Sequence, residues 1–137
     1  MTPLEELATR CEAASGNDAE LFLDVFRAMF PKPEQVWVTD NNGPWTPEYA
    51  DWSKRQDEFY EFVEVGAFND AAMTLIPEDC CLHQMGNVPD NPPSSKWWAA
   101  LWREGDEEDL GEVNACTSAL VIAAACLKAR AMEASNG

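Results

Sequence analysis

The sequence predicts an α+β fold in which a small antiparallel sheet packs against helices as an α/β sandwich, with a helical hairpin at the N-terminus and a long C-terminal helix. Three observations predict it. Two capped helical patterns precede Pro31, two apolar runs with strand character flank a proline-rich loop, and the last segment is rich in alanine and leucine. The 137 residues, 46% of them hydrophobic, fit a single acidic domain spanning 1–137.

The helical hairpin is predicted from its start signals. Thr2 can cap a first helix that has proline at its first position, and Glu5 can complete a capping box. Asn17 or Asp18 can cap a second helix. The apolar stripe of this second helix consists of Leu21, Phe22, Val25, Phe26 and Met29.

The middle of the chain carries a weaker pattern. A short β-prone run at 36–39 is closed by a turn at 40–44, and Thr46 and Pro47 then repeat the cap-and-proline signal. Apolar residues follow at helical spacing as far as Val63, although 59–65 is equally compatible with a strand. We favour the helix, followed by a shorter one over 68–76.

Residues 80–85 and 96–102 are the best strand candidates, and we expect them to pair in antiparallel fashion across a long loop. The acidic run 104–112 is expected to be a surface loop that leads into the final helix from about Asn114. In the second strand, Trp98 and Trp102 share one face, which we expect to pack on the helices; the other face, with Trp97, is expected to be exposed. Core packing is the favoured role of these tryptophans, with an interface as the alternative.

The charge balance bears on the partner. Nine Lys and Arg against 25 Asp and Glu give a net charge of −16 and a pI of about 4.1. A field of this sign repels nucleic-acid phosphates and anionic membranes and attracts basic surfaces. We therefore expect a protein partner with a basic, nucleic-acid-binding surface, with no direct binding of nucleic acid or membrane. A homo-oligomer is compatible with the sequence.

The N-terminal residues carry no export signal, and no apolar run has the length of a membrane span. Five cysteines, an odd number, indicate reduced thiols in this setting. The expected location is the cytoplasm.

The acidic residues gather in two clusters, which are the candidate partner-binding sites. At helical spacing, three glutamates of the second cluster form a stripe. A plain solvated face is the alternative explanation for both. The candidate residues are Glu104, Asp106, Glu107, Glu108, Asp109 and Glu112 in one cluster, Asp57, Glu58, Glu61 and Glu64 in the other, and Trp97.

Residues 80–83 form the one cluster with potential reactivity. On a strand, Cys81 and His83 point to the same face and supply two ligands, where a structural zinc site needs four. His83 is the only histidine, and no glycine-rich phosphate loop is present. We favour buried thiols and a partly exposed histidine, and assign no catalytic, cofactor or metal residue. The chain is not expected to be an enzyme.

Three segments carry a family resemblance: 7–16, with the sequence LATRCEAASG, 70–78, with DAAMTLIPE, and 117–130, with TSALVIAAACLKAR. In order and spacing they resemble the phage ABA-sandwich domain family, small proteins of tailed phages and prophages. The resemblance implies an α/β sandwich and a phage origin, and it supplies no reaction and no catalytic residues. The stretch from Lys32 to Glu64 has no counterpart in it.

These observations together suggest a phage or prophage accessory protein that acts as a non-catalytic binding module in the host cell cytoplasm. Its most specific form is a counter-defence inhibitor, similar to an anti-CRISPR protein, that uses an acidic surface as a nucleic-acid mimic. The alternatives are an oligomeric structural or morphogenetic phage component and a small enzyme or ligand-binding protein.

Overall fold

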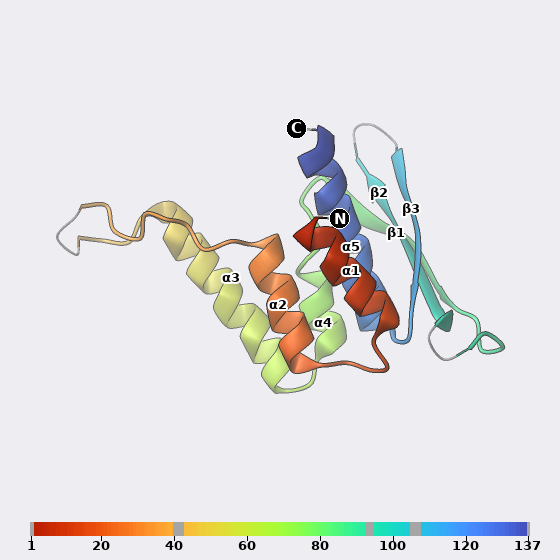
Figure 1. The fold of residues 1–137 in the computed structure, drawn as a ribbon. Helices are drawn as coiled ribbons and strands as arrows, with labels where there is room; N and C mark the ends of the chain where they lie inside the picture. Colours follow the sequence, from red (N-terminus) through yellow and green to blue (C-terminus); the bar gives the residue numbers. More distant parts are fainter. Residues whose placement is uncertain (1, 40–42, 93–94, 105–107, 137) are drawn as a thin grey trace.

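The computed structural model describes residues 2–39, 43–92, 95–104 and 108–136, apart from the side chains of 108–111 and 134–136. Within these residues the fold is α+β, as predicted, with a three-stranded antiparallel sheet of order β1-β2-β3 beside five helices (Figure 1). The elements in chain order are α1 (Pro3–Ala13), α2 (Ala19–Met29), α3 (Pro47–Glu64), α4 (Phe68–Met73), β1 (Cys80–Asn87), β2 (Trp97–Arg103), β3 (Glu108–Ala115) and α5 (Ser118–Asn136).

Helix α5 lies at the centre of the molecule. It contacts α1, α2 and α4 as well as β2 and β3, so that it lies between the sheet and the helices α2 and α4, while α1 also contacts β3 directly (Figure 1). Every residue from Ala119 to Leu127 is buried. The alanines among them let neighbouring elements approach closely from all directions, which explains why this helix lacks a polar face over that stretch.

The predicted helix starts are confirmed. The Thr2 hydroxyl accepts a hydrogen bond from the Glu5 amide at 3.2 Å, and the Thr46 hydroxyl accepts one from the Tyr49 amide at 3.2 Å. Of the two caps considered for the second helix, Asp18 fills the position. The whole predicted stripe of α2 is buried. Helix α3 continues through Val63, which decides residues 59–65 in favour of the helix.

The predicted helix over 68–76 is shorter in the structure. Helix α4 ends at Met73, and the Thr74 hydroxyl donates to the Ala71 carbonyl at 2.7 Å within the following turn. Leu75 is nevertheless fully buried, because this turn carries its side chain into the core. The spacing of buried residues therefore continues beyond Met73, which is why the sequence pattern predicted a longer helix.

The expectation of a surface loop over 104–112 is wrong for its second half. Residues 108–115 form β3, which pairs with β2 through Trp97 opposite Ala115 and Ala99 opposite Val113. Val113 and Ala115 are buried on the side of α5, while Glu112 and Asn114 are exposed. The burial of these two small apolar side chains, together with the ladder, favours a strand in spite of its acidic composition. The final helix starts at Ser118, not near residue 114.

The two faces of β2 are the reverse of those expected. Trp97 packs against the core together with Ala99 and Leu101, so its predicted exposure is wrong. Trp98 lies instead over Gly86, where an added Cβ would be 2.6 Å from the indole nitrogen, and this face looks away from the helices. The physical reason is size, because the smaller Ala99 and Leu101 fit against the core in the middle of the strand, while the larger Trp97 packs at its end.

Candidate functional site

The predicted acidic stripe lies on the exposed face of α3. This helix turns Phe59 and Val63 into the core, with exposed fractions of 0% and 8%. The four carboxylates on the other side are all exposed, and none is paired with a cation among the residues that the structure describes. We call this surface the α3 acidic face; it consists of Asp57, Glu58, Glu61 and Glu64.

The α3 acidic face is unfavourable for the helix that carries it. Glu61 and Glu64 lie at the C-terminal end of α3, where the helix dipole is negative, and the last turn has no basic residue. Carboxylates three or four residues apart also repel one another. Of the two bases on α3, Arg55 turns away and places its guanidinium 4.5 Å from the ring centre of Phe30. The other base, Lys54, lines a pocket together with Glu58, whereas no base of α3 lies within four residues of Glu61 or Glu64.

The second predicted cluster lies elsewhere on the molecule. Glu104 is exposed directly after β2, and Glu112 is exposed in the middle of β3, opposite Ala100. Glu108 and Asp109 begin β3, although their side chains are not described. Asp106 and Glu107 lie outside the described residues. Helix α3 lies beyond the other helices, on the side away from the sheet (Figure 1). The structure therefore does not bring the two clusters together, and Trp97 joins neither of them.

The structure reveals an aromatic surface that the sequence reasoning missed. Residues 31–39 and 43–46 form an arm that projects from the helices beside the start of α3 (Figure 1). Trp37 and Trp45 face each other across this arm with ring centres 6.4 Å apart, and they are 37% and 49% exposed. The signal was present in the sequence, because the two tryptophans flank the turn at 40–44 at positions that a hairpin would pair.

The arm is held in place by hydrogen bonds. The Val38 amide donates to the Pro44 carbonyl at 2.7 Å, and the Thr46 amide donates to the Val36 carbonyl at 2.9 Å. At the base of the arm, the Trp52 indole donates to the Phe30 carbonyl at 2.8 Å, which ties α3 to the end of α2. These bonds hold the two strands of the arm in register, and with it the backbone from which the exposed rings project.

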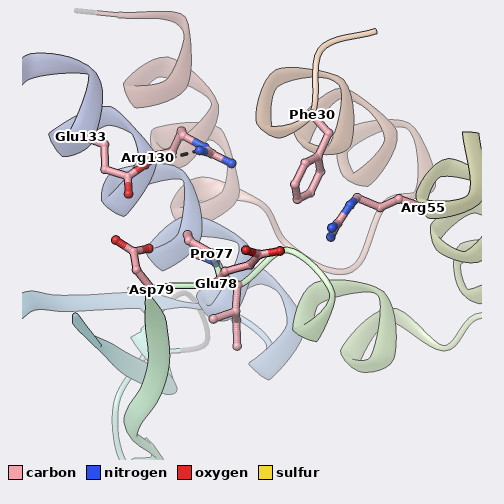
Figure 2. Close-up of a pocket in the computed structure, with 8 residues that line it drawn as sticks. Phe30, Arg55, Pro77, Glu78, Asp79, Arg130 and Glu133 are labelled. Atoms are coloured by element: carbon pink, nitrogen blue, oxygen red, sulfur yellow. Dashed lines mark hydrogen bonds and ion pairs between the residues drawn. The ribbon is translucent and has the colours of Figure 1, made fainter. Parts of the chain in front are cut away.

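A cavity of about 390 Å³ opens between the end of α2, α3, α5 and the segment before β1 (Figure 2). Two guanidiniums and three carboxylates meet there, without a histidine, cysteine or serine in the lining. The lining residues are Phe30, Arg55, Ile76, Pro77, Glu78, Asp79, Arg130 and Glu133. The cavity therefore combines carboxylates and guanidiniums with a small apolar part of the lining.

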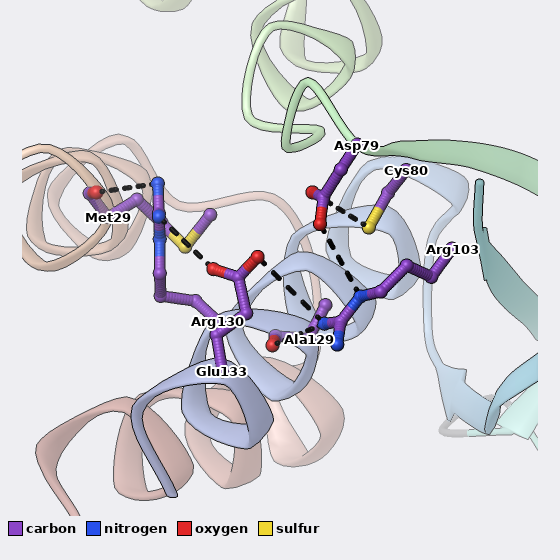
Figure 3. Close-up of polar contacts among 7 residues, drawn as sticks. All are labelled: Met29, Asp79, Cys80, Arg103, Ala129, Arg130 and Glu133. Carbon is purple, nitrogen blue, oxygen red and sulfur yellow. Dashed lines mark hydrogen bonds and ion pairs between the residues drawn. The ribbon is translucent and has the colours of Figure 1, made fainter. Parts of the chain in front are cut away.

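Most of these charges are used within the fold (Figure 3). The Arg103 side chain, 11% exposed, lies 3.5 Å from Asp79 and 4.0 Å from Glu133, and it donates to the Ala129 carbonyl. Arg130 pairs with Glu133 at 3.3 Å and donates to the Met29 carbonyl. This network links the sheet, α5 and α2, which indicates a structural role.

The cysteines and the histidine were the other side chains with potential reactivity. All five thiols are free. Burial raises the pKa of Cys11 to about 12 and also raises the pKa of Cys126, which makes both poor nucleophiles near neutral pH. The ring of His83 is stacked on Trp102, with ring centres 4.9 Å apart. In the described part of the chain, no three metal-binding side chains gather into a site.

Comparison with protein-family models, curated proteins and solved structures finds no match to this chain. None of the helices that the structure describes combines the length and the apolar character needed to cross a bilayer.

Proposed function

We propose that this protein is a phage or prophage accessory protein that binds a basic partner protein through the α3 acidic face. The observation that carries this proposal is the row of exposed, unpaired carboxylates at a helix end where they are electrostatically unfavourable. Natural proteins tend to break local rules at functional sites. A sequence selected for stability alone would place lysine or arginine in the last turn of α3.

The spacing of these charges supports a nucleic-acid mimic. Glu58, Glu61 and Glu64 are three residues apart, which corresponds to a rise of about 4.5 Å along a helix. A nucleic-acid strand carries one phosphate for about every 3.4 Å of duplex axis. Rows of negative charge with comparable spacing fit the same type of basic groove.

The specific form of the proposal is a counter-defence inhibitor that occupies the nucleic-acid channel of an immune effector such as a CRISPR complex. It is supported by the net charge of −16 and by the resemblance of three segments to a phage family. An inhibitor of this type needs no catalytic residue, since occupation of the channel is sufficient.

The test is a phage challenge of cells that carry active CRISPR systems of different types. Expression of the parent chain should restore plaque formation with at least one of them. The variant Glu58→Gln/Glu61→Gln/Glu64→Gln should lose this protection. The matched control, Glu6→Gln/Glu20→Gln/Glu78→Gln, removes the same three charges from exposed sites elsewhere and should retain it.

The mechanism is tested with the purified effector. Binding of the parent should compete with the effector's nucleic acid and weaken as salt rises, because the Debye length falls from about 10 Å at 0.1 M to about 3 Å at 1 M. The variant Asp106→Asn/Glu107→Gln/Glu108→Gln/Asp109→Asn tests the second cluster independently. If both variants bind like the parent with the same salt dependence, the acidic surface is only a solvated face. If the parent protects against no system, the counter-defence form fails.

A further inference from the structure

The projecting arm presents a continuous series of aromatic rings. Trp37 lies against Trp45, whose ring centre is 5.1 Å from that of Tyr49, and Tyr49 in turn lies 5.6 Å from Trp52. The inner end of the series is anchored by the Trp52 hydrogen bond to the body of the protein. The outer end, with the two half-exposed tryptophans, faces solvent.

These tryptophans contribute little to the fold, since they lie outside the buried core. Exposed aromatic side chains that are fixed in position are typical of binding hot spots, because few rotamers are lost when a partner docks. Val38, 52% exposed, extends the same apolar surface. The arm therefore has the properties of an anchor for a partner.

The charges around the rings indicate what kind of group docks there. Glu34, Glu48 and Asp51 are exposed near the base of the arm. A cation already occupies one ring, since the Lys32 ammonium lies 5.9 Å from the centre of Tyr49. Ring faces in an acidic surrounding attract cations, and arginine in particular stacks on tryptophan.

We propose that the arm is a docking site for an arginine-bearing segment of the partner protein, with Trp37 and Trp45 receiving its guanidinium groups. This inference rests on the proposed function, because the partner is the same basic protein that binds the α3 acidic face. The arm leads directly into the start of α3, and the second half of the same helix carries the α3 acidic face. The rings supply affinity at short range, while the carboxylates supply the long-range attraction.

The charges of the chain argue against the other occupants of such a surface. A second copy carries the same net charge of −16, so two arms meet under repulsion. Proteins that bind single-stranded nucleic acid also stack its bases on aromatic rings, but they need basic side chains along the path of the nucleic-acid backbone. Here three exposed carboxylates, Glu34, Glu48 and Asp51, lie in the same stretch of chain as the rings, against one nearby lysine, Lys32.

The experiment uses the full chain and a defined probe, a nine-residue peptide of alternating glycine and arginine, immobilised for biolayer interferometry. A peptide with lysine in place of arginine has the same charge and serves as the probe control. The variant Trp37→Ala/Trp45→Ala removes the rings without changing any charge, and Trp37→Phe/Trp45→Phe keeps smaller rings in the same places. Circular dichroism checks that each variant is folded.

The alanine variant should bind the arginine peptide about 5- to 30-fold more weakly, since each exposed cation–π contact contributes a factor of about two to five. The dependence of binding on salt should stay unchanged, and the phenylalanine variant should recover most of the affinity. The loss should be smaller for the lysine peptide. The variant Glu58→Gln/Glu61→Gln/Glu64→Gln should instead lower the salt dependence.

Three results would overturn the inference about the arm. The first is equal binding of the arginine peptide by the parent and the alanine variant, or no binding by the parent at about 0.01 M salt, where the Debye length is about 30 Å. The second is a parent dimer in sedimentation that the alanine variant abolishes. The third is binding of an oligothymidine by the rings. A plaque assay in which the acidic variant loses protection while the alanine variant keeps it would leave the proposed function intact.

Discussion

Replacing Glu61 with Gln should stabilise the protein, although the substitution removes an exposed charge from the surface. Glu61 lies in the last turn of α3 and forms no ion pair with a residue that the structure describes. Asp57 precedes it by four residues, Glu58 precedes it by three and Glu64 follows it by three. All three are carboxylates at distances along the helix where side chains are neighbours.

The size of the effect follows from these neighbours. Each like-charge pair destabilises a helix by about 0.2–0.5 kcal/mol, and a carboxylate at the negative helix end adds about 0.3–1 kcal/mol. Together these terms give an expected gain of about 1–2 kcal/mol in the free energy of unfolding. For a chain of 137 residues this corresponds to a rise in Tm of about 3–7 °C.

Thermal and urea unfolding at low salt and in 1 M NaCl measure the gain. The control is Glu6→Gln, because Glu6 lies in the first turn of α1, where a carboxylate is favourable. Glu6→Gln should lower stability by about 0.3–1 kcal/mol. A lower Tm for Glu61→Gln, or a gain of equal size in 1 M NaCl, would refute the electrostatic reasoning. A variant that is more stable but binds its partner less well would show that stability and function compete at this helix.

Three further predictions follow from the sheet and the buried thiols. Gly86→Ala should lower the free energy of unfolding by about 1–3 kcal/mol, because the new methyl group collides with the Trp98 indole; an unchanged urea midpoint would contradict this contact. Stability should fall as pH rises from about 9 towards 12, by up to about 1.4 kcal/mol per pH unit for Cys11, since the unfolded thiol loses its proton near its ordinary pKa of 9.0 while the folded one keeps it. Urea titrations of the parent and Cys11→Ala measure this, and equal slopes against pH would count against it. His83→Ala should leave any biological activity within a few fold, and complete loss in a folded variant would revive an enzymatic or metal-binding function.

The parts of the fold that local chemistry determines could be predicted from the sequence. Thr2, Asp18 and Thr46 each donate or accept within a few residues, so their capping roles can be read without knowledge of the rest of the chain. The stripe of α2 and the pairing of β1 with β2 follow from periodicity in the same way. These features depend on neighbours along the chain.

The third strand could not be predicted, because its causes lie far away in the sequence. The run from Glu108 to Glu112 has the composition of a loop, and only the pairing with β2 and the burial of Val113 against α5 make it a strand. The faces of β2 depend on the same register. A period of two reveals which tryptophans share a face, but it does not reveal which face meets the core.

For the candidate site, the exposure of the acidic residues could be predicted from the sequence, whereas the exposed tryptophans could not. The α3 acidic face was predicted as a stripe on a helix, and the four side chains are exposed as that pattern required. Trp97 packs against the core and does not have its expected exposure, and the exposed rings are Trp37 and Trp45. A composition rich in tryptophan indicates aromatic contacts, yet it does not distinguish a core ring from a projecting one.

The central position of α5 has a consequence for biosynthesis. This helix is translated after every other described element, although all the layers of the fold pack against it. At roughly 5–20 residues per second, the ribosome needs about 5–20 s to proceed from the end of α2 to the end of α5. Throughout that interval the face of α1 that packs against α5 lacks its cover. Slower elongation over this stretch lengthens the time for which chaperones and proteases have access to the nascent chain.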